Sequence, residues 1–400
     1  MNDYSVVIIG GGPLGRKFAR SLSDGKRSIA LVETSFSPDH DLEVLMKNLA
    51  LGGAIPDADE KLPIDTQIFA GPCEFVSEKM LRAGGKELRS DKFVIATGAS
   101  LRKTPVNVVN AASVLTPNQA LDPEFRPKTV AVIGGGAIGA TVAQHLAKKG
   151  AAVSLFQKSP RLLSAFDLDI SDAIQRILTR DGIKLELNAA ADAVSKLKFE
   201  QIVVATGFVA NTAGLGLKNA GCYVGPDERI AVNEECRTSA PSIWAAGAVT
   251  GPPFRLSYAA YHQSIVEANL FAPFFAKSKS DLETMPAAIP FDPPIASVGL
   301  SEVQSREKTR NIRILKAGLD QNERAVKDGR ADGFLKIVAH GKTGKILGAH
   351  AVGPRAEEFI VLLDLIMRAE FSLHDLTDTH RIPPLSYGDT LRQVLDQWSI

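Results

Sequence analysis

A strand, a glycine-rich turn and a helix follow one another at the start of the chain, and this combination restricts the fold more than any other feature. The apolar run at residues 6–9 predicts a buried parallel strand. Glycines follow at once with the spacing GxGxxG, and apolar residues at helical spacing continue to Leu22. A second predicted strand ends on Glu33. This order, with its terminal acid, indicates a dinucleotide-binding unit.

Each residue of this unit has an expected role. Gly10 permits the tight turn, Gly12 lets backbone N–H groups approach a pyrophosphate, and Gly15 lets the helix pack close to the sheet. The helix N-terminus then faces the phosphate charge, and the Glu33 carboxylate can accept hydrogen bonds from ribose hydroxyls. The sequence therefore predicts a nucleotide site that contains these residues together with Gly11.

The same pattern occurs a second time with equal spacing. A predicted strand at residues 129–133 leads into a second glycine turn and helix, and Gln157 stands where the first copy has Glu33. Such a repeat indicates two dinucleotide-binding units, because two ordinary βαβ units with capping glycines would rarely match so well. The predicted site residues of the second copy are Gly134, Gly136 and Gly139.

A shorter pair of segments supports the duplication. Residues 93–98 and residues 202–207 both read as a buried strand that ends in Ala-Thr-Gly. Open α/β sheets bind their ligands at this carboxyl edge. We therefore expect Thr97 and Gly98 to lie at the first nucleotide site.

With residues 243–251, these motifs resemble the pyridine nucleotide-disulfide oxidoreductases, the family of dihydrolipoamide dehydrogenase, glutathione reductase and mercuric reductase. The resemblance covers nearly the whole chain. It implies an α/β fold with two Rossmann-like units, FAD in the first and NAD(P) in the second, and a C-terminal α+β dimerisation domain. The expected domains are an FAD-binding type at 1–104 and 236–285, an NAD(P)-binding type at 105–235, and the dimerisation domain at 287–400.

Three parts of the family pattern differ here. The family carries a redox cysteine pair soon after the first acid, whereas no cysteine precedes Cys73. The family's third motif ends in Gly-Asp, whose carboxylate binds the FAD ribityl chain, but this chain has Gly247 and Ala248. Ile382 and Tyr387 replace the C-terminal His-Glu pair. No residue can therefore be named as catalytic.

These differences lead to two hypotheses. The first is an FAD-dependent NAD(P)H oxidoreductase without a redox disulfide, which passes electrons from flavin directly to a small acceptor. The second is a catalytically silent relative, kept for dimerisation or partner binding. Ala248 and the short segment after Glu33 favour the second hypothesis and predict weak FAD binding.

The loop after Gln157 bears on the choice of nucleotide. An acid there would pair with the free ribose hydroxyl of NAD, whereas a 2′-phosphate requires cations. Lys158 and Arg161 therefore favour NADPH, and a solvated basic loop is the alternative reading.

Several side chains outside the motifs have weaker expected roles. Tyr258, Tyr261 and His262 are candidate substrate contacts, although structural packing is the favoured interpretation of each. The apolar helix at residues 358–367 is the expected homodimer interface, with Leu363 facing the partner.

Composition limits the partners. The net charge is +1, which gives no electrostatic reason to expect nucleic acid or an anionic membrane. The three cysteines are widely spaced, so neither a disulfide framework nor a metal site is predicted. No apolar run is long enough to span a bilayer and no signal segment is visible, so the expected location is cytoplasmic.

Overall fold

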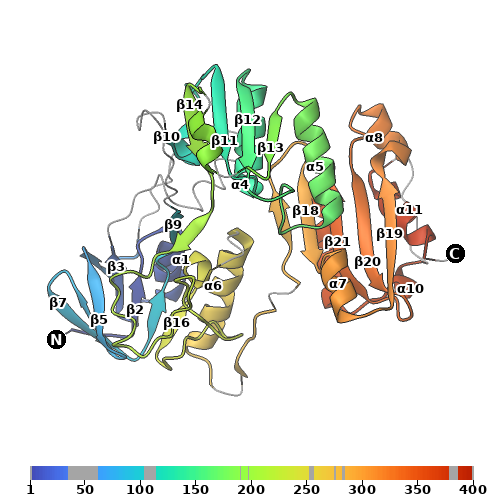
Figure 1. Cartoon of the computed structure of the whole chain (residues 1–400). Helices are drawn as coiled ribbons and strands as arrows, with labels where there is room; N and C mark the ends of the chain where they lie inside the picture. The colour runs from blue at the N-terminus through green and yellow to red at the C-terminus, as the bar shows by residue number, and fades with distance from the viewer. Residues whose placement is uncertain are drawn as a thin grey trace. The chain divides into compact units, whose positions relative to one another are not determined.

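The computed structural model describes residues 2–34, 62–102, 114–189, 191–196, 198–251, 256–273, 276–281, 284–377 and 386–398. The chain divides into two compact regions. Region 1 comprises Met1–Lys103 and Gly207–Asp281, and region 2 comprises Thr104–Thr206 and Leu282–Ile400. Each region contains a five-stranded sheet of largely parallel, βαβ-connected strands (Figure 1). The α/β fold expected from the sequence is thereby confirmed.

The main sheet of region 1 is built around β2 (Val6–Ile9), whose four residues are all buried. It has the strand order β16-β8-β2-β3-β4, and the paired strands run parallel. Its other strands are β3 (Ile29–Glu33), β4 (Thr66–Ala70), β8 (Phe93–Ile95) and β16 (Ile243–Ala245).

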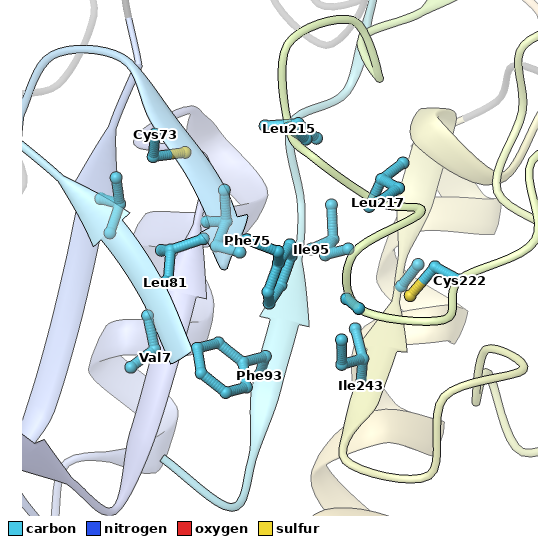
Figure 2. Packing of buried hydrophobic residues seen from close by; sticks show 14 of the residues in the cluster. Val7, Cys73, Phe75, Leu81, Phe93, Ile95, Leu215, Leu217, Cys222 and Ile243 are labelled. Carbon is cyan, nitrogen blue, oxygen red and sulfur yellow. The ribbon is translucent and has the colours of Figure 1, made fainter. Parts of the chain in front are cut away.

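Side chains alternate between the two faces of this sheet, as the period of a strand requires. Val6 and Ile8 pack with residues of α1 (Pro13–Leu22) and α6 (Leu256–Leu270), and this set forms one hydrophobic cluster. Val7 and Ile9 belong to the cluster on the opposite face, which Figure 2 shows. Both faces are therefore covered.

The second cluster joins the main sheet to a smaller one with the order β1-β7-β6-β5. The sequence of residues 67–89 predicts a hairpin with its turn at residues 83–86. This turn is confirmed, since Gly84 and Gly85 connect β6 to β7 with positive φ angles. The sequence interpretation was wrong for residues 67–70, which lie in β4 and extend the parallel sheet instead of the hairpin. The small sheet consists of β1 (Asn2–Tyr4), β5 (Cys73–Ser77), β6 (Met80–Ala83) and β7 (Lys86–Ser90).

The parallel sheet of region 2 has the order β10-β14-β11-β12-β13. Its central strand β11 (Thr129–Ile133) and the following α4 (Ala137–Lys148) and β12 (Ala152–Gln157) confirm the predicted second strand–helix–strand unit. The remaining elements are β10 (Val114–Leu115), α3 (Pro117–Ala120), α5 (Leu168–Arg180), β13 (Lys184–Leu187) and β14 (Gln201–Val204).

An antiparallel sheet completes region 2, with the order β17-β18-β21-β20-β19. The sequence predicts a hairpin of residues 334–339 and 346–351 around a turn at residues 341–344. This hairpin is confirmed as β20 (Phe334–His340) and β21 (Ile346–Val352). The other strands are β17 (Ala287–Ile289), β18 (Ile295–Gly299) and β19 (Ile312–Gly318), and the helices are α7 (Glu302–Lys308), α8 (Glu323–Lys327), α9 (Ala356–Arg368), α10 (Leu373–Leu376) and α11 (Gly388–Asp396).

Helix α9 packs one face on this sheet. The expectation that Leu363 faces a partner was wrong, because Leu363 is fully buried in the hydrophobic cluster of the sheet. Other apolar residues of α9 lie on the surface: Val361 and Leu365 are each 64 % exposed, and Leu362 is 42 % exposed. The exposed apolar face of the helix thus differs from the predicted one.

The sequence also predicts a short helix at residues 42–51 and a capping or packing role for His380. Both of these, and the position of Ile382, lie outside the described residues. In the ranges that are described, no helix has both the length and the apolarity needed to cross a bilayer.

The core of region 1 yields a stability prediction. Phe75 is fully buried and meets Phe93 edge to face, with ring centroids 5.2 Å apart. Phe75→Ala should lower the free energy of unfolding by about 3–5 kcal/mol, since it removes buried area and leaves a cavity. Val76 is 38 % exposed, so Val76→Ala is the matched control and should cost less than about 1 kcal/mol. Urea unfolding followed by tryptophan fluorescence measures both, and equal midpoints would contradict the prediction.

Candidate cofactor-binding sites

The first glycine turn brings backbone atoms together more closely than any side chain would allow. Gly10 has φ +118°, and a Cβ added there would lie 2.4 Å from Ala96 O. A Cβ on Gly15 would lie 1.8 Å from Gly10 O, so α1 rests directly on the turn. The Gly10 N–H donates to Val32 O at 2.9 Å, which ties the turn to β3. The sequence requires glycine here because of these contacts.

Helix α1 starts in a way that leaves N–H groups for a ligand. Its N-cap is Gly12, which offers no side-chain acceptor, and Pro13 follows. The first N–H groups of a helix have no intrahelical partner, and their positive end attracts anions. This arrangement suits a phosphate group, as predicted for the first site.

Glu33 lies against the glycine turn and has an ionic partner that sequence reasoning missed. A Cβ on Gly11 would lie 2.4 Å from Glu33 Cγ, so the two residues are in direct contact. Arg16 donates from Nη2 to Glu33 Oε1 at 2.5 Å and from Nε to Gly11 O at 2.9 Å. In the sequence, this ion pair is indicated by an arginine directly after the third glycine of the turn. This pair is partly exposed, so it contributes little to stability but fixes the carboxylate beside the turn.

Thr97 and Gly98 follow β8, also at the carboxyl edge of the sheet. The Thr97 hydroxyl donates to Asn211 O at 2.7 Å, and Asn211 Nδ2 returns a bond to Thr97 O at 2.9 Å. The hydroxyl is therefore used within region 1, where β9 (Ala99–Leu101) pairs with β15 (Phe208–Ala210). Gly98 has φ +69° and open space where a Cβ would point.

The Gly247 turn opens η4 (Gly247–Thr250), a 3₁₀ helix that packs against α6. Gly247 has φ +73°, and a Cβ there would lie 2.7 Å from Leu14 Cδ2. Its N–H donates to Nδ1 of His262 at 3.3 Å. The next residue is Ala248, so the turn presents a methyl group where a carboxylate was expected from the family resemblance.

The candidate substrate contacts on α6 are structural. His262 is fully buried and Tyr258 is 5 % exposed, with their ring centroids 4.1 Å apart. Burial lowers the pKa of His262 to about 4, so its imidazole is neutral and can accept the Gly247 bond. The hydroxyl of Tyr261 accepts a hydrogen bond from Asp281 N at 3.0 Å. The packing interpretation is therefore the better one for Tyr258 and His262.

The second glycine turn has nearly the same backbone geometry as the first. Gly134 has φ +110°, and a Cβ there would lie 2.3 Å from Ala205 O, while a Cβ on Gly139 would lie 1.7 Å from Gly134 O. The N-cap of α4 is Gly136, again without a side-chain acceptor and with open space beside it. The Gly134 N–H donates to Phe156 O at 2.8 Å. Two anion-accepting turns of the same geometry therefore exist in one chain.

Gln157 occupies the position of the acid in the second copy and binds the loop around it. Its Oε1 accepts from Gly135 N at 3.0 Å, and its Nε2 donates to Ser159 Oγ at 2.6 Å and to Arg161 O at 3.3 Å. Arg161 donates to Ser164 O at 2.9 Å. Lys158 is exposed, and within the described part of the chain it has no carboxylate partner. The loop thus presents two cations beside the turn.

The described residues contain no group of three or more His, Cys, Asp and Glu side chains that could hold a metal ion.

Comparison with known proteins supplies the family. The signature described as "Pyridine nucleotide-disulphide oxidoreductase" matches residues 4–268, and the dimerisation domain of the same family matches residues 285–389. The chain is 33% identical to a mercuric reductase from Staphylococcus aureus over 81% of its length and 62% of the relative. It is 30% identical to a dihydrolipoyl dehydrogenase from Zymomonas mobilis over 82% of its length and 75% of the relative.

The match to the mercuric reductases is partial, since the chain spans about three fifths of their length. In fold, the chain is similar to the HOCl-induced flavoprotein disulfide reductase RclA from Escherichia coli, with a TM-score of 0.82 at 24% identity over 99% of this chain and 100% of that one. Members of this family use FAD and NAD(P)H. The two glycine turns, the sheet orders and these matches together establish that the chain belongs to the pyridine nucleotide-disulfide oxidoreductase family.

Proposed function

We propose that the chain is an FAD-dependent NAD(P)H oxidoreductase that works without a redox disulfide and passes electrons to a small acceptor. The observation that carries the proposal is the pair of uncapped helix N-termini at Gly12 and Gly136, each set on a glycine turn. Each of these N-termini leaves backbone N–H groups that suit the pyrophosphate of a dinucleotide. The domain limits predicted from the sequence and the cytoplasmic location stay predictions beside this proposal.

The residues of region 1 fit one end of FAD better than the other. Gly10, Gly12 and Gly15 would hold the pyrophosphate, and Glu33, fixed by Arg16, would accept ribose hydroxyls. The ribityl end has lost its carboxylate at Ala248. Bound FAD would supply the hydride-accepting centre, and the protein would supply binding and orientation. The site therefore favours weak but specific FAD binding.

The cysteines support a reaction without disulfide exchange. Cys73, Cys222 and Cys236 are free and buried, and Figure 2 shows Cys73 and Cys222 among the apolar side chains of the core. Burial raises the pKa of Cys73 to about 11 and that of Cys236 to about 12, and it also raises the pKa of Cys222. A protonated, enclosed thiol does not attack a disulfide.

This leads to a prediction on thiol reactivity. With a pKa of about 11, the thiolate fraction of Cys73 at pH 8 is about one in a thousand. A coloured thiol reagent should therefore label the folded protein slowly at pH 8 and all of its cysteines quickly in denaturant. Rapid labelling of any cysteine before unfolding would show that a reactive thiol exists.

Cofactor binding is the main test of the proposal. Purified protein should bind added FAD, observed by quenching of flavin fluorescence, and Ala248→Asp should tighten binding by about one to two decades because it restores a charged acceptor. Glu33→Ala should weaken binding, since it removes the ribose contact. With FAD bound, NADPH should reduce a quinone, whereas oxidised glutathione and lipoamide should not be reduced at enzymatic rates.

The outcomes separate the two hypotheses. A lack of FAD binding by calorimetry, in both the unmutated protein and Ala248→Asp, would exclude the oxidoreductase and favour the silent relative. Ala248, in place of the family's ribityl-binding carboxylate, is the observation that supports this second candidate. Turnover of lipoamide that is lost when the three cysteines are mutated would contradict the proposed mechanism instead, because it would show thiol chemistry.

The cations after Gln157 predict a preference for NADPH. Replacing both Lys158 and Arg161 by alanine should weaken NADPH binding by about two to four decades and leave NADH binding nearly unchanged, since charge-assisted contacts to phosphate are worth about 1.5–3 kcal/mol each. Fluorescence titration of the reduced nucleotides measures both affinities. Equal affinities for the two nucleotides in the unmutated protein would rule out this assignment.

A homodimer is proposed from the dimerisation-domain match and the exposed apolar face of α9. Leu365→Arg should yield monomers at micromolar concentration, because a buried arginine in an apolar interface lacks a partner. Val303 on α7 is 59 % exposed, so Val303→Arg is the control and should stay dimeric. Sedimentation velocity distinguishes the species, and a monomeric unmutated protein would disprove the dimer.

A further inference from the structure

A buried lysine lies where the two sheets of region 2 meet. Lys336 of β20 is 1% exposed. Its Nζ contacts Asp167 Oδ1 at 2.9 Å, Asp169 Oδ2 at 2.7 Å and Glu302 Oε2 at 2.8 Å. An ammonium group has three N–H donors, so each donor has a carboxylate. These four residues are called the Lys336 cluster below.

The cluster is charged and therefore rigid. Burial alone would lower the pKa of Lys336, but the carboxylates around it raise that pKa above the ordinary value. Burial alone would raise the pKa of Asp167, yet hydrogen bonds from Glu302 N and Lys336 hold it below the ordinary value. A buried ion pair tolerates little displacement, because losing one partner leaves an unpaired charge.

Asp167 connects the cluster to the start of α5. It is the N-cap of that helix, and its Oδ1 accepts from Asp169 N at 3.1 Å. Its Oδ2 accepts from Glu302 N at 2.9 Å, at the start of α7. Helix α5 also contacts β13 of the parallel sheet and β21 of the antiparallel sheet, both in region 2 (Figure 1). Lys336 thus fixes the point at which the loop from β12 ends.

The loop at residues 158–166 is also held at its start, beside Gln157, and along its middle. Gln157 binds Ser159 and Arg161, as described above. Leu163 N donates to Gly135 O at 2.9 Å, and a Cβ on Gly135 would lie 2.4 Å from Leu162 Cδ2. The loop is therefore pressed against the second glycine turn between two anchors.

We propose that Lys336 is a positioning residue for the pyridine nucleotide: through Asp167 it holds residues 158–166, so that Lys158 and Arg161 stand at a set distance from the second glycine turn. This inference rests on the proposed NADPH preference, since the proposed role of Lys336 is to position those two cations. Lys336 itself touches no nucleotide. Its effect should be selective for the 2′-phosphate, because the backbone site for the pyrophosphate belongs to α4 and not to this loop.

The ladder between β19 and β20 provides a matched control. Lys316 is the cross-strand partner of Lys336, but its side chain is 41% exposed and its Nζ pairs with one carboxylate, Asp169, at 2.7 Å. The same Nζ lies 4.4 Å from the centroid of the Phe334 ring, and its removal leaves the three contacts of Lys336 in place. Lys336→Met and Lys316→Met remove the same group from neighbouring positions. Glu302→Gln, at a side chain 29% exposed, replaces one carboxylate of the cluster by a neutral amide and serves as the milder variant if Lys336→Met fails to fold.

The experiment measures amide hydrogen exchange of residues 158–166 in the nucleotide-free protein, and the affinities for NADPH and NADH. Lys336→Met should speed exchange in this segment and weaken NADPH binding by about tenfold, as expected for misplaced contacts, with NADH changed less than about twofold. Glu302→Gln should act in the same direction by about threefold, and Lys316→Met should change neither quantity.

The two readouts keep this inference separate from the proposed function. Unchanged exchange of the segment in folded Lys336→Met, or in Glu302→Gln, would overturn the positioning role. Faster exchange in a protein that binds NADPH and NADH equally would support positioning of the loop and refute the NADPH assignment. Equal loss of both nucleotides would show that Lys336 stabilises region 2 as a whole and does not position the cations.

Discussion

The contact between a helix and the turn before it is the constraint on which both nucleotide units depend. In each copy the third glycine rests on the carbonyl of the first, where a side chain would lie within 2 Å of that oxygen. This contact directs the N-terminus of α1 or α4 toward the carboxyl edge of its sheet. It also brings the end of the following strand, with Glu33 or Gln157, beside the turn. This one close contact between backbone atoms therefore places the helix N-terminus, and the side chain of Glu33 or Gln157, at the same edge of the sheet.

Local features could be predicted from the sequence, and features that depend on distant contacts could not. The glycine turns, the Gly84–Gly85 hairpin and the β20–β21 hairpin follow from short-range chemistry. The pairing of β4 with β3 and the exposed face of α9 do not, because α9 is apolar on nearly all sides and only packing decides that Leu363 is buried. Arg16 beside Glu33 and His262 under Gly247 likewise require the fold.

Region 2 is joined by polar contacts as well as by apolar packing. Beside the Lys336 cluster, Gln144 of α4 exchanges hydrogen bonds with the backbone of Asp292, whose carboxylate also pairs with Arg330. Buried ionic contacts add little net stability compared with apolar packing, but they accept only one arrangement of the groups that make them. The loop at residues 158–166 and the antiparallel sheet are therefore held in one fixed arrangement.

The amide of Gln157 has a consequence for how this site could change during evolution. It accepts a bond from Gly135 N and donates bonds to Ser159 and to Arg161 O, so both ends of the amide are used. A carboxylate is only an acceptor. Substituting glutamate would thus repel the carbonyl of Arg161 and loosen the loop. A change of the proposed nucleotide preference would therefore require a rebuilt loop as well as a new charge at this position.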